Sequence, residues 1–148
     1  MIQNIKVNYK KMNTEKITVQ TTIAADKTKV WNYYTQPQHI TNWNFADPSW
    51  HCPKATNNMI VGEQYFARME AKDGSFGFDF IANYLEIINQ EKFTYEFGGR
   101  LATVEFNKID NQTEVIITFD AETENSIELQ KNGWQAILNN FKNYVESN

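Results

Sequence analysis

Residues 125–148 read N-S-I-E-L-Q-K-N-G-W-Q-A-I-L-N-N-F-K-N-Y-V-E-S-N, and this stretch decides the fold. Its apolar residues recur at the spacing of a one-sided α-helix, and they are Ile127, Trp134, Ile137, Leu138, Phe141 and Val145. Asn125 is expected to cap the helix, and Glu128 completes a capping-box pattern. The stretch therefore predicts one long helix with a single apolar stripe.

Alternating, ring-rich segments precede this helix and predict strands, because side chains of a strand point to its two faces in turn. The expected strands cover residues 17–23, 63–71, 76–88, 92–97, 101–109 and 113–121, and the length of the third allows a bulge. Alternation places one set of residues on the inner face: Tyr65, Ala67, Met69, Phe76, Phe78, Phe80, Ala82, Tyr84, Phe93, Tyr95, Phe97, Val104, Phe106, Val115, Ile117 and Phe119.

Two short helices are expected between the first and second of these strands. Asp26 can cap the first, which carries Val30, Trp31 and Tyr34 and ends near Pro37. The second is expected over residues 38–43, and residues 44–58 then read as a long loop. Long loops in compact domains are often functional.

The simplest way to bury the stripe of the helix and the inner face of the strands is to lay one across the other. We therefore predict an α+β fold in which a curved antiparallel sheet of about six strands wraps around the long C-terminal helix. Residues 15–148 are expected to form a single domain, preceded by a polar arm over residues 1–14. Gly133 inside the helix is expected to permit a close approach to a strand, with Ala82 as the small residue opposite.

Composition narrows the class of protein. A net charge of −4 with no basic run argues against nucleic acid as a partner. No stretch is long and apolar enough for a transmembrane helix, and residues 1–16 lack the apolar core of a secretory signal. The single Cys52 fits a reducing compartment, so we expect a soluble, cytoplasmic protein without a membrane partner.

Four short motifs carry a resemblance to a known family. They are Ile23-Ala24-Ala25 before Val30-Trp31; Thr35-x-Pro37 before Trp43; Gly62, Asp73-Gly74 and Tyr84-Leu85-Glu86-Ile87; and Gly133-Trp134 before Leu138 and Phe141. In this order and spacing, over about residues 16–146, they resemble the START-like (birch-pollen-allergen-like, helix-grip, or SRPBCC) superfamily. Within it the chain looks most like the family named for the activator of the ninety-kilodalton heat-shock protein's ATPase.

The chain departs from that family at a few positions. Gly62-Glu63 stands where paired glycines are usual, Ile60 where an Arg is usual, and Ala82 where a Gly is common. The resemblance implies a helix-grip fold with a cavity between the sheet and the C-terminal helix, and it implies no particular reaction.

Ring side chains near the two short helices and the long loop are the candidates for lining that cavity, because Tyr and Trp combine an apolar body with one hydrogen-bonding group. The predicted ligand-binding residues are Trp43, Phe45, Trp50, Tyr65, Met69, Phe78, Tyr84, Trp134 and Phe141. Tyr65, Tyr84, His51 and Arg68 are candidate polar anchors for a ligand.

Patterns of catalytic or metal-binding residues are not apparent. His51 and Cys52 are adjacent, and neighbours in extended backbone point to opposite sides and do not form a catalytic pair. The spacing of His39, His51 and Cys52 fits no zinc motif, and Asp79 is expected on the outer face. No phosphate-binding loop or dinucleotide fingerprint occurs, so we assign no catalytic residue, metal or cofactor.

Three functions remain open. The first is binding of a small hydrophobic or aromatic molecule, as a carrier or sensor, in a dry, ring-lined cavity of at least a few hundred cubic ångströms. The second is a protein-interaction or co-chaperone-type module, which the family name implies. Its partner would be a chaperone or a second copy of this chain. The third is a cavity enzyme, which we rank last because the inner faces carry almost no Asp, Glu or His.

Overall fold

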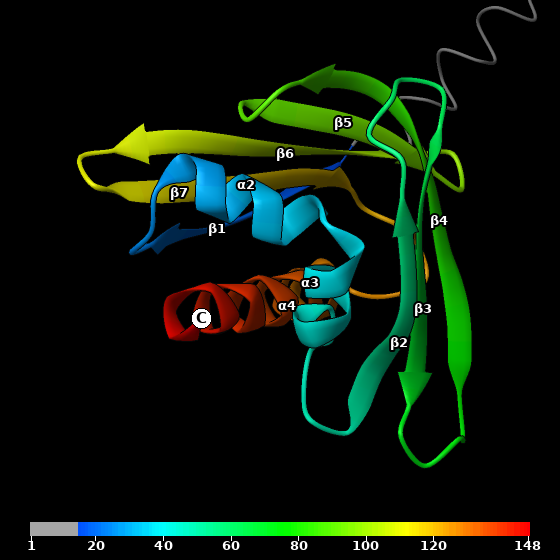
Figure 1. The fold of residues 1–148 in the computed structure, drawn as a ribbon. Helices are drawn as coiled ribbons and strands as arrows, with labels where there is room; N and C mark the ends of the chain where they lie inside the picture. Colours follow the sequence, from blue (N-terminus) through cyan, green and yellow to red (C-terminus); the bar gives the residue numbers. More distant parts are fainter. Residues whose placement is uncertain (1–14) are drawn as a thin grey trace, which may run out of the picture.

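The computed structural model describes residues 15–148, and the polar arm predicted for residues 1–14 lies outside the described residues. Within that range one antiparallel sheet has the strand order β1-β7-β6-β5-β4-β3-β2. The sheet bends strongly, so that β2, β3 and β4 run steeply to the lower right in Figure 1 while the other strands lie across the top. All three labelled helices lie inside the bend, which confirms the predicted α+β helix-grip fold.

The strands are β1 (Lys16–Ile23), β2 (Trp50–Asn57), β3 (Gln64–Ala71), β4 (Gly77–Ile88), β5 (Lys92–Phe97), β6 (Arg100–Ile109) and β7 (Gln112–Asp120). The prediction of a loop over residues 44–58 was wrong, because β2 pairs with β3 and adds a seventh strand. The pairing shifts register between His51 and Lys54, around Pro53. Proline lacks an N–H donor and is tolerated at a bulge in an edge strand, which is where Pro53 lies.

The helices are α2 (Lys27–Thr35), α3 (Pro37–Trp43) and α4 (Ile127–Ser147). The Asp26 side chain accepts a hydrogen bond from Lys29 N (2.9 Å), as predicted for the cap of α2. The prediction that Asn125 caps α4 was wrong by one residue. Ser126 Oγ accepts from Leu129 N (3.0 Å), while the backbone oxygen of Asn125 accepts from Gln130 Nε2 (2.9 Å). No helix among the described residues is long and apolar enough to cross a membrane.

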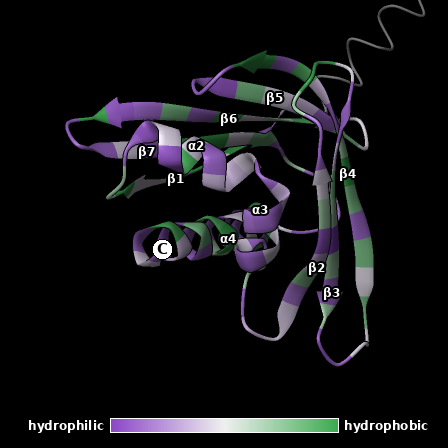
Figure 2. Ribbon diagram, viewed as in Figure 1, coloured by the Kyte–Doolittle hydropathy of each residue, from purple (hydrophilic) through white to green (hydrophobic). Residues whose placement is uncertain are grey.

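The core occupies the concave side of the sheet, and Figure 2 shows hydrophobic and hydrophilic residues alternating along several of the strands. Most of the inner-face residues predicted from alternation are buried, among them Phe93, Phe106 and Phe119. The expected bulge in β4 is present between Tyr84 and Glu86. Alternation was misleading for Phe76, which is 61% exposed, because the end of the β3–β4 hairpin projects beyond the helices (Figure 1).

Gly133 does not serve a close approach between α4 and the sheet. A Cβ built on Gly133 would meet no atom within 4 Å, so the prediction that Ala82 packs opposite was wrong. The helix instead packs against β1 at one edge of the sheet and against α2 and α3. Space is therefore left between α4 and the middle strands.

Candidate ligand-binding cavity

A cavity of about 230 Å³ lies between α4 and the inner face of the sheet, just below the size expected from the sequence. It exists because α4 rests on β1 and does not close onto β3, β4 and β5. The lining residues come from α2, α3, five strands and α4, together with Asn44, which directly follows α3. They are Tyr34, Trp43, Asn44, Tyr65, Met69, Phe78, Phe80, Tyr95, Phe97, Arg100, Ile117, Trp134, Ile137 and Leu138.

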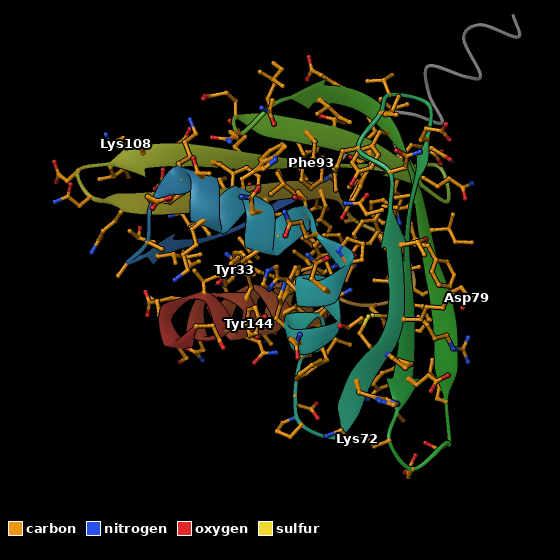
Figure 3. All side chains as sticks on the ribbon, in the orientation of Figure 1. Tyr33, Lys72, Asp79, Phe93, Lys108 and Tyr144 are labelled. Carbon is orange, nitrogen blue, oxygen red and sulfur yellow. The ribbon has the colours of Figure 1, made fainter. Side chains whose placement is uncertain are left out.

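Two periodicities bring these side chains together. On β3, β4 and β5 the lining residues of one strand are two or four positions apart, so that they share the inner face, as Phe78 and Phe80 do on β4. On α4, Ile137 and Leu138 follow Trp134 by three and four positions, so that the three side chains form one stripe. The middle of the molecule is filled with side chains between sheet and helices, including the labelled Phe93 in Figure 3.

Aromatic rings form a nearly continuous wall on the sheet side. Phe80 lies with its ring centroid 5.9 Å from Tyr65, 5.9 Å from Tyr95 and 5.2 Å from Phe97. Trp134 of α4 continues the wall 5.9 Å from Phe97. Such separations are typical of stabilising ring pairs. Contacts between these rings therefore stabilise the wall, which presents an apolar surface to the cavity.

Three phenol groups, those of Tyr34, Tyr65 and Tyr95, are among the polar groups of the lining. Burial raises the pKa of Tyr34, Tyr65 and Tyr95 well above the ordinary value, so all three remain neutral at physiological pH. The Tyr65 hydroxyl accepts a hydrogen bond from Asn44 Nδ2 (3.3 Å). These groups can hydrogen-bond a ligand, and being neutral they are poorly suited to acid–base chemistry at pH 7.

Arg100 is the cationic side chain of the lining, and it begins β6 directly after the Gly98-Gly99 turn. Its Nη1 donates to the backbone oxygen of Asp120 (3.2 Å), and its guanidinium lies over the Phe97 ring at 4.6 Å from the centroid. Burial lowers the pKa of Arg100, against an opposing effect of Glu122 and Asp120. The group stays charged, since an arginine pKa remains far above neutrality.

Five of the nine residues predicted to bind a ligand line the cavity: Trp43, Tyr65, Met69, Phe78 and Trp134. The other four lie elsewhere. Phe141 and Tyr84 are fully packed core residues, and the Tyr84 hydroxyl donates to Asn57 Oδ1 (2.7 Å). Trp50 packs on Phe76 and Phe78 outside the lining, and Phe45 is half-buried beside α3.

Two of the predicted polar anchors face away from the cavity. Arg68 pairs with Glu70 (2.8 Å) and Asp79 (3.1 Å) on the outer face of the sheet, where Figure 3 labels Asp79. His51 lies 3.3 Å from Glu70 on the same face, whereas the adjacent Cys52 is buried. The anchor predictions for Arg68 and His51 were wrong, because β2 and β3 turn these side chains outward.

Several lining residues were not among the predicted ones. Phe80, Tyr95, Phe97 and Ile117 had been placed on the inner face by alternation, so the pattern found their side of the sheet but not their place beside the hollow. Arg100 was not predicted as a lining residue. Its position after a turn gives no indication in the sequence that its side chain lies over the Phe97 ring.

Comparison with known proteins agrees with this architecture. A family model described as "Activator of Hsp90 ATPase homolog 1-like protein" matches residues 24–146. The chain belongs to this family. That membership confirms the resemblance drawn from the Val30-Trp31 and Gly133-Trp134 motifs. A search of curated proteins found no match.

Solved structures of similar proteins have the same fold. An AHSA1-like protein from Aeromonas hydrophila is 36% identical with a TM-score of 0.85, over 90% of this chain and 93% of that one. A protein from Cytophaga hutchinsonii is 42% identical with a TM-score of 0.78, over 89% and 92%. A protein from Chromobacterium violaceum, at 20% identity and a TM-score of 0.78 over 88% and 97%, shows the likeness of fold alone.

Proposed function

We propose that this protein binds a small apolar or aromatic molecule in the cavity under α4, as a carrier or sensor. The observation that carries the proposal is the ring-lined hollow itself, framed by Tyr65, Phe80, Tyr95, Phe97 and Trp134. Binding sites for small molecules are typically concave, mostly apolar and furnished with a few polar groups. The neutral phenols and Arg100 are such groups.

The cavity volume limits the size of the ligand. An engineered apolar cavity of about 150 Å³ in another protein accepts benzene, so about 230 Å³ has room for a two-ring compound. Burying roughly 300 Å² of apolar ligand surface contributes about 7 kcal/mol. Association costs of at least about 4 kcal/mol offset much of this. Apolar burial alone therefore leaves at most about 3 kcal/mol, which corresponds to a dissociation constant on the order of several mM, and hydrogen bonds to the polar groups of the lining should tighten the binding of a neutral two-ring probe.

The test is a titration of ¹⁵N-labelled protein with naphthalene-2-carboxamide, followed by NMR. We expect saturable shifts of the Trp43 and Trp134 indole N–H signals, since both rings line the cavity. Ile137→Trp should abolish binding by filling the cavity from α4. Leu129→Trp is the matched control, because it adds the same ring at an exposed position of the same helix.

Two results would contradict the proposal. One is the absence of saturable shifts in a protein whose spectrum shows it to be folded. The other is equal affinity of the Ile137→Trp and Leu129→Trp variants, which would locate the probe outside the cavity.

A second candidate function is docking to a protein partner, and a surface observation favours it. Ile81 and Leu85 of β4 are 45% and 52% exposed, and the exposed Ile60 and Val61 directly precede Gly62, whose N–H donates to Tyr84 O of the same strand (2.9 Å). Contiguous exposed apolar residues often mark interaction sites, and the family name points to a chaperone. If this function holds, the protein should stimulate the ATPase of a purified Hsp90, and Ile81→Glu/Leu85→Glu should remove the stimulation.

A further inference from the structure

Arg100 is the one cationic side chain among the residues that line the cavity in the described part of the chain. It is half-buried, and its recorded protein partners are one backbone oxygen and one aromatic ring. A guanidinium has five N–H donors, so most of them are left for another partner. Removing a charge from water costs free energy unless the charge is paired. The Arg100 guanidinium therefore favours an anionic partner in the cavity.

The carboxylates whose charge reaches Arg100 are already engaged elsewhere. Asp120 binds the Lys16 ammonium and accepts a hydrogen bond from Leu101 N (2.8 Å). Glu122 accepts from the backbone N–H groups of Glu124 (2.7 Å) and Asn125 (3.0 Å). Within residues 15–148 no carboxylate lies within 4 Å of the Arg100 guanidinium.

We propose that the ligand of the cavity is a small aromatic or aliphatic acid whose carboxylate binds the free edge of Arg100. This inference rests on the proposed function and specifies the class of ligand. The apolar part of the acid would lie against the rings of Phe80, Phe97 and Trp134. The ring of Phe97 and the oxygen of Asp120 already hold the guanidinium in place, so binding costs little further side-chain entropy.

A single carboxylate suits this site better than a phosphate. The planar guanidinium presents two parallel N–H groups that match the two oxygens of a carboxylate. A single positive charge balances a single negative one. A phosphate dianion would retain an excess charge against an apolar wall that holds no second cation among the described lining residues.

The test compares two probes of nearly equal size and shape, naphthalene-2-carboxylate and naphthalene-2-carboxamide, at pH 7. We expect the carboxylate to bind the wild-type protein about tenfold or more tightly, because a charge-assisted hydrogen bond contributes more than a neutral one. Arg100→Gln should remove that preference, so that the variant binds the two probes with affinities within about twofold of each other.

Lys131→Gln provides the matched control, since it removes the same charge from an exposed position of α4. The preference for the carboxylate should survive in this variant. If Lys131→Gln weakened the preference as much as Arg100→Gln, the effect would be one of net charge, and the proposal would be overturned.

The outcomes separate this inference from the proposed function. Binding of the amide with no preference for the carboxylate would overturn the role of Arg100 and leave the cavity function standing. Failure of both probes to bind the wild-type protein would overturn both. A preference that persists in a folded Arg100→Gln variant would place the carboxylate elsewhere in the molecule.

Discussion

At the scale of single residues, Asn57 joins three elements. Its side chain lies at the end of β2, donates to the Thr35 backbone oxygen at the end of α2 (2.7 Å), and accepts from the Tyr84 hydroxyl of β4 (2.7 Å). Both partners are buried. This one amide therefore fixes the added strand β2 to the helical layer and to the sheet beneath it.

Replacing Asn57 by Ala should lower the free energy of unfolding by about 1–3 kcal/mol, because it leaves the Tyr84 hydroxyl and the Thr35 carbonyl without their partner. Urea denaturation measures the change. Asn58→Ala is the control, since Asn58 is the exposed neighbour and its loss should cost no more than about 0.5 kcal/mol. Equal losses in the two variants would show that the bridge contributes nothing to stability.

At the scale of elements, α4 also covers an open edge of the sheet. Polar side chains on one flank of the helix hydrogen-bond the backbone of β1 and of Ala24 just after it: Gln135 with Gln20 O (3.1 Å), Lys142 with Thr22 O (2.8 Å) and Glu146 with Ala24 N (2.8 Å). Because β1 ends the strand order, no other strand of the described residues 15–148 pairs with this edge. Unpaired edges invite association with other chains.

The triple variant Gln135→Ala/Lys142→Ala/Glu146→Ala should lower the free energy of unfolding by about 1–3 kcal/mol in total. It should also make the sedimentation coefficient rise with protein concentration, as chains pair through the exposed edge of β1. Urea denaturation and sedimentation velocity measure the two effects.

A control variant with the same change in charge is available on the exposed side of α4. Glu128→Ala/Lys131→Ala/Asn143→Ala also removes one acid, one base and one amide from the helix. This control variant should stay monomeric at every protein concentration at which the wild-type protein is monomeric. Self-association of the control alone, or of neither variant, would show that the three contacts do not protect β1.

At the scale of the whole molecule, several weak acids share one buried environment around the cavity. Burial raises the pKa of the Cys52 thiol from 9.0 to about 11. It also raises the pKa of the phenols of Tyr34, Tyr65, Tyr84 and Tyr95. The neutral forms of these groups are therefore favoured by folding.

We predict that the protein loses stability as the pH rises above about 9. The unfolded chain releases these protons first, so the folded chain binds more protons, and the free energy of unfolding falls with pH. Each group contributes at most about 1.4 kcal/mol per pH unit in its window. Urea midpoints between pH 8 and pH 10.5 measure the loss.

Cys52→Ala should reduce the slope that begins near pH 9, because the thiol has the lowest ordinary pKa of the set. The phenols should still destabilise the protein above pH 10 in this variant. A urea midpoint that stays constant from pH 8 to pH 10.5 would contradict the burial of these groups in the folded state.

Strand alternation predicted which side of the sheet a residue faces, but not strand pairing or what covers that side. Alternation identified the inner residues of β3, β5, β6 and β7, because the period of a strand leaves a side chain only two directions. It failed for β2, because Pro53 within the strand and Pro48 before it read as a loop, while the strand character comes from pairing with β3. It also overestimated the burial of Phe76, since alternation indicates a face of the sheet but not whether anything covers it.

By itself the sequence determined the order of the elements other than β2, the amphipathic α4 and the family, because these depend on local periodicity and motif spacing. Only the tertiary structure decided where the hollow lies. The position of α4 over β1 makes Tyr84 and Phe141 packed core and turns Phe80, Phe97 and Arg100 into cavity wall. A cavity is the space that packing leaves unfilled, and that space depends on how every element is placed relative to the others.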